Sequence, residues 1–354
     1  MLNQEQALDA LRLVVEPGLQ RDIVALGFVQ ELKVSDGRVA FELQTVRPGE
    51  AAEKLKREAE DKLKAAGAEA VAIELTGRAR GNPVGDGQGS LPGVRNIIPI
   101  ASGKGGVGKS TVSANLAVAL RQTGARVGLL DADIYGPSIP TIMGARQGPQ
   151  LQGQQIIPPV LHGVAMCSTG FFLNPDQAVM WRGPMLSKMV DELFRRVIWG
   201  ELDYLIVDLP PGTGDVQITM CQRIALTGAV IVTTPQPVAV QVAEKAVIMF
   251  QQLKTPLLGV VENMAYFESA KTGEREYIFG SGGADALAGH WDIPVLGRIP
   301  LATNLRESSD AGAPIVVSNP DSPAAKGFAD AAAQLIAAVS VRNLNAEKPV
   351  EINF

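Results

Sequence analysis

The sequence predicts an α/β protein with a mostly parallel sheet, preceded by a smaller α+β domain. From residue 96 onward, continuous apolar runs alternate with segments of helical apolar spacing, as in a parallel sheet that helices cover on both faces. Before residue 77, two apolar runs flank a turn signal and lie between helical segments. Residues 77–93 hold six glycines and two prolines without an apolar period, which is typical of a flexible linker.

The small domain is expected over residues 1–76, and the linker over 77–94. Apolar positions at helical spacing, an Ala/Glu/Lys/Leu-rich stretch and a Ser-Asp-Gly turn define its elements. In chain order we expect helices over 4–15 and 19–26, a hairpin of 28–34 with 38–43, a helix over 50–66 and a strand over 70–75.

The large domain is expected over residues 95–342, with a tail over 343–354. Its strands are short apolar runs, and its helices carry one apolar stripe. We expect strands at 96–101, 126–130, 204–207, 229–232, 257–261 and 295–299, and helices at 113–122, 183–199, 240–253 and 323–339.

The composition excludes several classes of function. The 354 residues include 32 Lys and Arg against 37 Asp and Glu, so no basic surplus exists to bind nucleic acid. No apolar run reaches the roughly 18 residues of a membrane span, and the acidic start does not resemble a signal peptide. We therefore expect a cytoplasmic protein with no membrane partner. The two cysteines, Cys167 and Cys221, exclude a disulfide framework.

A phosphate-binding loop is the strongest motif. Residues 103–111 match G-x-x-x-x-G-K-[ST] and lie between an expected strand and an expected helix. Backbone N–H groups of such a loop, together with a helix N-terminus, suit the phosphates of ATP. Lys109 is expected to reach the β- and γ-phosphates and Ser110 to bind Mg²⁺. The candidate nucleotide-binding residues here are Gly103, Lys104, Gly105, Gly106, Val107, Gly108, Lys109, Ser110 and Thr111.

Carboxylates follow two of the expected strands. Asp208 ends an apolar run, the pattern of a Walker B acid that binds Mg²⁺ through water. Residues 210–214, Pro-Pro-Gly-Thr-Gly, form a candidate switch that senses the γ-phosphate. Asp131 and Asp133 follow the second strand and face the ligand crevice of an open sheet. Asp131 either orders the loop or joins the Mg²⁺ shell, and helix capping or turn formation is the alternative for both residues.

Lys104 makes the loop more specific. Lys-Gly-Gly-Val-Gly-Lys-Ser-Thr over 104–111 resembles the deviant Walker A motif of the MinD/ParA/nitrogenase-iron-protein ATPases. The resemblance implies a P-loop NTPase that works as a homodimer, in which Lys104 reaches the nucleotide of the partner. It also implies that Asp133 lies in switch I and positions the attacking water. Lys104, Lys109 and Asp133 are thus the candidate catalytic residues of a slow ATPase. A solvated loop charge is the alternative for Lys104.

Further stretches narrow the resemblance to the Mrp/ApbC family of iron–sulfur cluster carrier ATPases. It covers residues 95–340, and the small domain is similar to the iron–sulfur assembly domain often fused to that family. The family implies that Asn263 hydrogen-bonds adenine, that Pro300 and Leu301 line the base pocket, and that partners are iron–sulfur assembly proteins or apoprotein clients. The stretches that carry it are 133–140, 208–215, 261–264, 278–280 and 297–301, with 16–18 and 22–29 in the small domain.

The chain departs from this family in its cysteines. The family usually carries C-x-x-C shortly after the stretch containing Asn263, so that two protomers supply four thiolates to one [4Fe–4S] cluster. Ser269 and Thr272 stand in those positions, and hydroxyls are poor cluster ligands at neutral pH. Cys167 and Cys221 are interpreted as buried structural cysteines. The cluster is therefore implied by the family, while no ligand for it is identified.

Three hypotheses follow. The first is an ATP-hydrolysing dimer that serves iron–sulfur cluster assembly or transfer. The second is a MinD/ParA-like positioning ATPase, against whose membrane version the tail argues because it has two cations and no amphipathic stripe. The third is a nucleotide-gated adaptor that carries no cluster, in which the small domain presents a surface to a partner.

Overall fold

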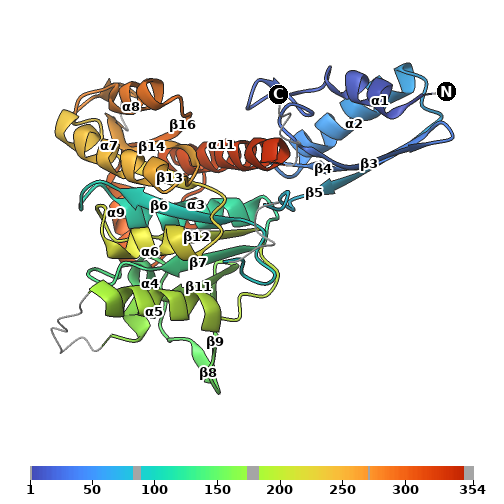
Figure 1. The fold of residues 1–354 in the computed structure, drawn as a ribbon. Coiled ribbons are helices and arrows are strands. Elements are labelled where there is room, and N and C mark those ends of the chain that lie inside the picture. Colours follow the sequence, from blue (N-terminus) through green and yellow to red (C-terminus); the bar gives the residue numbers. More distant parts are fainter. Residues whose placement is uncertain (1, 83–88, 174–182, 270–271, 347–354) are drawn as a thin grey trace, which may run out of the picture.

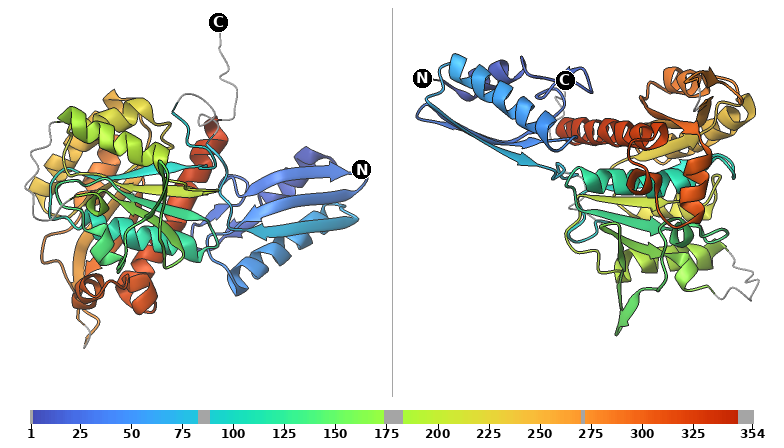
Figure 2. Two further views of the ribbon diagram at one scale, coloured as in Figure 1. Left: turned by 90° about the horizontal axis from the view of Figure 1, so that it is seen from below. Right: turned by 180° about the vertical axis from the view of Figure 1, so that it is seen from behind.

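The computed structural model describes residues 2–82, 89–173, 183–269 and 272–346. It consists of a large body, in which helices enclose a sheet, and a small domain at the blue end of the chain (Figure 1). The long helix α11, Pro323–Ala346, runs from the body to the small domain, and the views from below and behind show the same contact (Figure 2). The proposed tail falls partly on this helix, and residues 347–354 lie outside the described residues.

The small domain is a three-stranded sheet with two helices on one face (Figure 1). β3 and β4 pair antiparallel as expected, and β5 adds parallel to β4. The buried side of α2 carries Ala52, Leu55, Ala59 and Leu63 at helical spacing. The elements are α1 (Gln4–Leu11), β1 (Val15–Glu16), β2 (Arg21–Asp22), β3 (Val29–Ser35), β4 (Arg38–Gln44), α2 (Glu50–Ala65) and β5 (Ala70–Thr76).

The helix expected over residues 19–26 is wrong. Residues 19–26 form turns on either side of the short strand β2, which pairs with β1. The carboxylates of Glu16 and Asp22 accept hydrogen bonds from the backbone N–H groups of Leu19 and Ala25, at 2.6 and 2.7 Å. Such local side-chain bonds offer the backbone an alternative to the helix, and here they outweigh the apolar spacing.

Among the described residues the large sheet has nine strands, in the order β10-β11-β7-β12-β6-β13-β14-β15 with β16 also paired to β14. All neighbours from β11 to β16 run parallel, and only the pairs β10–β11 and β14–β15 are antiparallel. The strands are β6 (Ile97–Ser102), β7 (Val127–Asp131), β10 (Val160–Leu161), β11 (Val164–Ser168), β12 (Tyr204–Asp208), β13 (Ala229–Thr233), β14 (Leu257–Glu268), β15 (Arg275–Glu276) and β16 (Val295–Leu301). A separate hairpin, β8 (Gln150–Gln152) with β9 (Gln155–Ile157), extends from the body (Figure 1).

Helices cover both faces of this sheet, as the continuous apolar strands predict. One core joins the sheet to α3 and α11, and the other joins it to α5, α6, α7 and α8. The helices of the body are α3 (Lys109–Gln122), α4 (Ile139–Ile142), α5 (Gly183–Arg196), α6 (Asp215–Arg223), α7 (Pro237–Gln252), α8 (Gly283–Trp291), α9 (Thr303–Asp310) and α10 (Ile315–Ser318), besides α11.

The carboxyl ends of the central strands bring polar residues together. In the register of the sheet, Asp208 of β12 lies opposite both Asp131 of β7 and Ile100 of β6. Asp131 in turn lies opposite Ser168 of β11. The loop from β6 to α3 leaves the same edge, beside the place where the strand order reverses, which is where open α/β sheets bind ligands.

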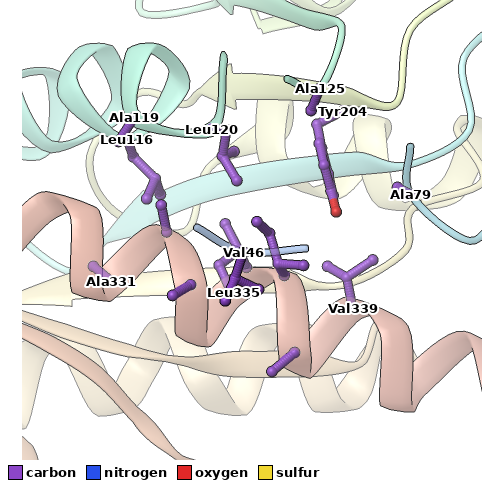
Figure 3. Close-up of a cluster of buried hydrophobic side chains, with 14 of the residues drawn as sticks. Val46, Ala79, Leu116, Ala119, Leu120, Ala125, Tyr204, Ala331, Leu335 and Val339 are labelled. Atoms are coloured by element: carbon purple, nitrogen blue, oxygen red, sulfur yellow. The ribbon is translucent and has the colours of Figure 1, made fainter. Parts of the chain in front are cut away.

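The small domain shares its apolar core with the body. Val46 of the small domain lies in one buried cluster with Leu335 and Val339 of α11 and with Tyr204 at the start of β12 (Figure 3). The side-chain amide of Gln44 donates to the hydroxyl of Tyr204 at 3.4 Å. Helix α11 is long and apolar enough to cross a membrane, but 61% of its most apolar stretch is buried inside the protein, as in a core helix.

The first part of the expected linker is packed against both domains. Ala79 is fully buried, and its backbone N–H donates to the Asp203 carboxylate at 3.3 Å. The carbonyl of Arg80 accepts the side-chain amides of Asn96 and Asn343, each at 2.9 Å. Residues 83–88 of the expected linker lie outside the described residues.

Candidate functional site

The phosphate loop runs from the end of β6 to the first turn of α3. Gly108 caps α3 in the left-handed conformation, with φ of 78°, and a Cβ at this position would lie 2.2 Å from the Asn263 side chain. A Cβ on Gly103 would lie 2.2 Å from the backbone of Val242 in α7. The motif therefore needs glycine at both positions, because the loop is held against α7 on one side and β14 on the other.

Asn263 holds the loop from β14. Its side chain is buried, and Nδ2 donates to the carbonyl oxygen of Val107 at 2.8 Å. The side-chain oxygen is left as an acceptor beside the pocket, which Asn263 lines. The structure thus gives Asn263 a contact with the loop that the sequence did not predict.

A fully buried Asp208 is the centre of the site. Its Oδ2 accepts the hydroxyl of Ser110 at 2.6 Å and lies 2.8 Å from Nζ of Lys109. Its other oxygen, Oδ1, accepts the hydroxyl of Ser113 at 2.6 Å. The expected Walker A and Walker B residues are therefore in direct contact, although 98 positions separate Ser110 from Asp208.

Lys109 also lies 3.7 Å from Oδ2 of Asp133, so that one buried ammonium sits between two carboxylates. Burial raises the pKa of Asp133, and the charge of Lys109 opposes that rise. The backbone N–H of Gly136 donates to Oδ1 of Asp133 at 3.3 Å. Asp133 is therefore held at the wall of the pocket with one oxygen near Lys109.

Asp131 lies behind these residues. Its two oxygens accept the backbone N–H groups of Asp133 and Ile139, at 3.1 and 3.3 Å, and the hydroxyl of Ser168 at 2.9 Å. Burial, followed by the neighbouring charge of Asp208, raises its pKa from 3.8 to about 8. Of the two sequence-based alternatives for Asp131, these contacts favour the ordering of the loop after β7.

A pocket of about 590 Å³ opens above the phosphate loop. Its floor is the loop from Lys104 to Thr111, and Asp133 and Pro211 reach its wall. Asn263, Pro300 and Leu301 also line it, together with residues of α4 and α9. The structure thus places the candidate base-binding residues and the candidate phosphate-binding residues around one cavity.

The candidate switch at 210–214 is tied to β6 and to α6. The N–H of Gly212 donates to the carbonyl of Ser102 at 2.8 Å. The buried side-chain amide of Gln217 donates to the carbonyls of Pro210 and Gly212, at 2.7 and 3.1 Å. The loop therefore touches the end of β6, one residue before the phosphate loop begins.

The donor set fits Mg²⁺. The carboxylates of Asp133 and Asp208 both face Lys109. The hydroxyl of Ser110 donates to Asp208, the expected Walker B acid. Hard oxygen donors of this kind, completed by phosphate oxygens and water, are what Mg²⁺ prefers. Asp208 and Ser110 would hold the ion, which would supply positive charge beside the phosphates.

The residues present do not fit an iron–sulfur cluster. Ser269 and Thr272 close a hairpin tip: the N–H of Thr272 donates to the Ser269 hydroxyl at 3.4 Å, and the Thr272 hydroxyl donates to Glu274 at 3.2 Å. Cys167 is buried in β11, which raises the pKa of its thiol to about 12, and burial also raises the pKa of Cys221 on α6. Protonated thiols are poor cluster ligands. Within the described ranges, no three His, Cys, Asp or Glu side chains gather as a metal site.

The sequence did not predict the roles of Ser113, Ser168 and Gln217. Ser113 and Ser168 hold acidic side chains from distant parts of the chain, whereas Gln217 holds the loop just before its own helix. Ser113 is recognisable only from its place one helical turn after Ser110, on the same side of α3. Ser168 carries no local signal, because Asp131 becomes its neighbour only through the strand order.

The parallel sheet, the phosphate loop at its carboxyl edge and the acid at the end of β12 together define a P-loop NTPase. The chain belongs to the family described as NUBPL iron-transfer P-loop NTPases, which matches residues 93–336. Residues 4–75 match the iron–sulfur cluster assembly protein domain. The fold and the family that the sequence predicted are thereby confirmed.

Individual relatives agree with this assignment. The iron–sulfur cluster carrier protein of Synechocystis is 44% identical over 353 residues, which cover 97% of this chain and 100% of that protein. A nucleotide-binding protein from Archaeoglobus fulgidus, solved in complex with ADP, is 44% identical with a TM-score of 0.56, covering 62% of this chain and 87% of its own. MinD from Pyrococcus horikoshii, solved with Mg-ADP, is 22% identical with a TM-score of 0.52 over 67% of this chain and 94% of its own, a likeness of fold.

Proposed function

We propose that this chain is a cytoplasmic ATPase that binds Mg-ATP in the pocket above the phosphate loop, hydrolyses it slowly and serves iron–sulfur cluster assembly or transfer to apoproteins. The observation that carries the proposal is the contact of Lys109, Ser110 and Asp208 at the base of that pocket. Membership of an iron-transfer NTPase family supports the link to clusters.

Binding requires the side chains at the base of the pocket to exchange partners. Lys109 moves its ammonium from Asp208 and Asp133 toward the phosphates, and the backbone N–H groups of residues 104–111 point at the same group. Oδ1 of Asn263 accepts from the amino group of the base, because Nδ2 is already bonded to Val107. Pro300 and Leu301 supply an apolar wall of the pocket for the base.

Hydrolysis depends on the acidic wall of the pocket. Asp133 orients a water molecule toward the γ-phosphate through the oxygen that now faces Lys109. Lys109 and Lys104 stabilise the charge that develops on the transferred group. Mg²⁺, held by Ser110 and by Asp208 through water, supplies further positive charge there.

A homodimer with nucleotide at its interface is supported by the surface around the pocket. In the described part of the chain Lys104 forms no ion pair, and it lines the pocket as a half-buried residue of the phosphate loop, free to reach a second copy. Tyr135 and Val238, which follow β7 and β13 at the same edge of the sheet, are 74% and 64% exposed. Apolar side chains around an unpaired cation suit a contact with another protein surface. ATP-dependent dimerisation is measured by sedimentation.

Asp133→Ala tests the proposed ATPase. The variant keeps the phosphate loop, so it binds Mg-ATP within about threefold of the unmodified chain, while phosphate release falls by about 100-fold or more because water is no longer oriented. Binding is measured by calorimetry and turnover by phosphate release. Normal turnover in Asp133→Ala refutes the role of Asp133, and an unmodified chain that releases no phosphate refutes the ATPase.

The hairpin tip favours a second candidate function, a nucleotide-gated adaptor that carries no cluster itself. The hydroxyls of Ser269 and Thr272 are bonded within the tip, and the two cysteines are buried or half-buried away from it. Anaerobic reconstitution with ferrous iron and sulfide, followed by iron and sulfide analysis, separates the two functions. A near-stoichiometric cluster supports the carrier, and its absence supports the adaptor.

A further inference from the structure

Ser113 is a buried side chain with a specific bond to the acid at the centre of the site. It lies one turn beyond Ser110 on α3, and its Oγ is 2.6 Å from Oδ1 of Asp208 and 3.0 Å from the carbonyl oxygen of Lys109. A serine within a helix commonly gives its single proton to the carbonyl four residues earlier. Here the carboxylate is nearer, at the length of a charge-assisted O–H···O⁻ bond, so the proton is donated to Asp208.

The two carboxylate oxygens of Asp208 differ in whether their hydrogen-bond partners remain bonded when nucleotide binds. Oδ2 is bonded to Ser110 and Lys109, the two side chains that the P-loop motif assigns to Mg²⁺ and phosphate. Once nucleotide enters the pocket, Lys109 contacts the phosphates and Ser110 binds Mg²⁺, so both leave Oδ2. Oδ1 is bonded to Ser113, which does not line the pocket. Ser113 is therefore the side-chain partner that Asp208 keeps in both states.

We propose that Ser113 is a positioning residue for the Mg²⁺ site: it fixes Oδ1 of Asp208 so that Oδ2 stays aimed at Ser110 and the metal. The inference rests on the proposed binding of Mg-ATP. Without this bond the Asp208 carboxylate can rotate toward other donors, and Oδ2 is no longer held toward Ser110 and the metal. Hydrogen bonds from such outer partners typically change metal affinity about 10- to 100-fold.

Ser113→Ala removes the hydroxyl and leaves the helix intact, since alanine has the highest helix propensity. A non-hydrolysable ATP analogue is titrated into the full chain, first in EDTA and then over a series of Mg²⁺ concentrations. We expect the affinity in EDTA to stay within about twofold, because Ser113 does not touch the nucleotide. The Mg²⁺ concentration that half-maximally tightens binding rises about tenfold or more. A purely structural role would weaken binding equally with and without the metal.

Ser340→Ala is the matched control. Ser340 is a buried helical serine that donates to the carbonyl of Gly27 at 3.0 Å, far along the chain from Asp208. Its replacement leaves the Mg²⁺ dependence unchanged. Ser113→Cys keeps the size of the side chain with a weaker donor, and it replaces the alanine variant if that variant does not fold. An unchanged Mg²⁺ dependence at position 113 overturns the inference, whereas an unmodified chain without Mg²⁺-dependent binding overturns the proposed function itself.

Discussion

Asp131 shows at the scale of one residue how a place in the sheet changes the chemistry of a carboxylate. It is fully buried, lies opposite Asp208 in the register of β7 and β12, and has its pKa raised to about 8 by burial and by that neighbour. Its surroundings therefore favour the protonated form of this carboxyl group. Its bonds to the N–H groups of Asp133 and Ile139 then serve to shape the loop after β7.

This shift predicts a pH dependence of stability. The unfolded chain releases the Asp131 proton above its ordinary pKa of 3.8, while the folded chain keeps it up to about 8. Between these values the native state binds more protons, so its stability falls as pH rises, by about 1.4 kcal/mol per pH unit at most. Asp131→Asn cannot titrate, and we expect its stability to fall less between about pH 5 and pH 8. Urea unfolding of both nucleotide-free proteins across this range measures the difference, and parallel profiles would contradict the assignment.

The sequence alone predicted those candidate site residues that belong to a local motif. Lys109 and Ser110 occupy fixed positions in the phosphate loop, and Asp208 ends an apolar run, so each was identified before the fold was known. The bond of Asn263 to Val107 was not predicted, because 156 positions separate the two residues. The hydrogen bond of Ser113 to Asp208 was not predicted either, because 95 positions separate the two residues and the motif ends before Ser113.

At the scale of elements, α6 and the loop before it form the part of the site most suited to switching. Gln217 holds the loop at 210–214 from the first turns of α6, and Gly212 holds it to β6. Both contacts are hydrogen bonds rather than apolar packing, so the loop can change its partners at a modest cost in free energy.

Gln217→Ala is expected to loosen this loop. The loss of the two side-chain bonds removes about 1 kcal/mol of local stability, so amide hydrogen exchange at 209–214 speeds up about fivefold. The measurement is exchange followed by mass spectrometry on the nucleotide-free protein. Gln122→Ala is the control, since Gln122 likewise donates its amide to a backbone carbonyl, that of Val316, but far from this loop. Equal exchange at 209–214 in all three proteins would show that Gln217 does not hold the loop.

Most long elements were predictable from their periodicity, and the failures have a physical cause. The segment 19–26 has helical spacing, yet the carboxylates of Glu16 and Asp22 hold it in turns. The strand expected over 257–261 extends to Glu268, because β15 and β16 pair with residues beyond the apolar run. Pairing of this kind depends on strands that are distant in sequence, which local patterns do not contain.

At the scale of the whole molecule, α11 and Tyr204 connect the small domain to the strand that ends in Asp208. Leu335 of α11 is fully buried in the cluster that Val46 joins from the small domain (Figure 3). Tyr204 begins β12 and Asp208 ends it. The small domain therefore packs against the opposite end of the strand that carries the centre of the site.

Apolar packing, more than surface charge, is expected to hold the two domains together. Leu335→Ala leaves a cavity and lowers the free energy of unfolding by about 2–5 kcal/mol. Arg47→Ala removes the 2.8 Å ion pair with Asp330, both of whose side chains are at least half exposed, and costs less than about 1 kcal/mol. Urea unfolding compares them. A larger loss for Arg47→Ala would mean that the ion pair, and not the shared core, carries the contact.

The docking of the domains was beyond what the sequence could predict. The glycines and prolines of 77–93 indicate a flexible linker, whereas Ala79 and Arg80 are fixed by Asp203, Asn96 and Asn343. Their partners lie just before β12, just before β6 and on α11, and they meet only in the folded protein.

The central claim is that the pocket above the phosphate loop binds Mg-ATP through Lys109. Calorimetric titration of Mg-ATP into the unmodified chain, Lys109→Ala and the exposed-surface control Lys326→Ala tests it most directly. We predict one ATP per chain for the unmodified protein and for Lys326→Ala, and a loss of affinity of at least about tenfold for Lys109→Ala, because a buried charge-assisted contact is removed. Equal affinity in Lys109→Ala, or no binding by the unmodified chain, would contradict the claim.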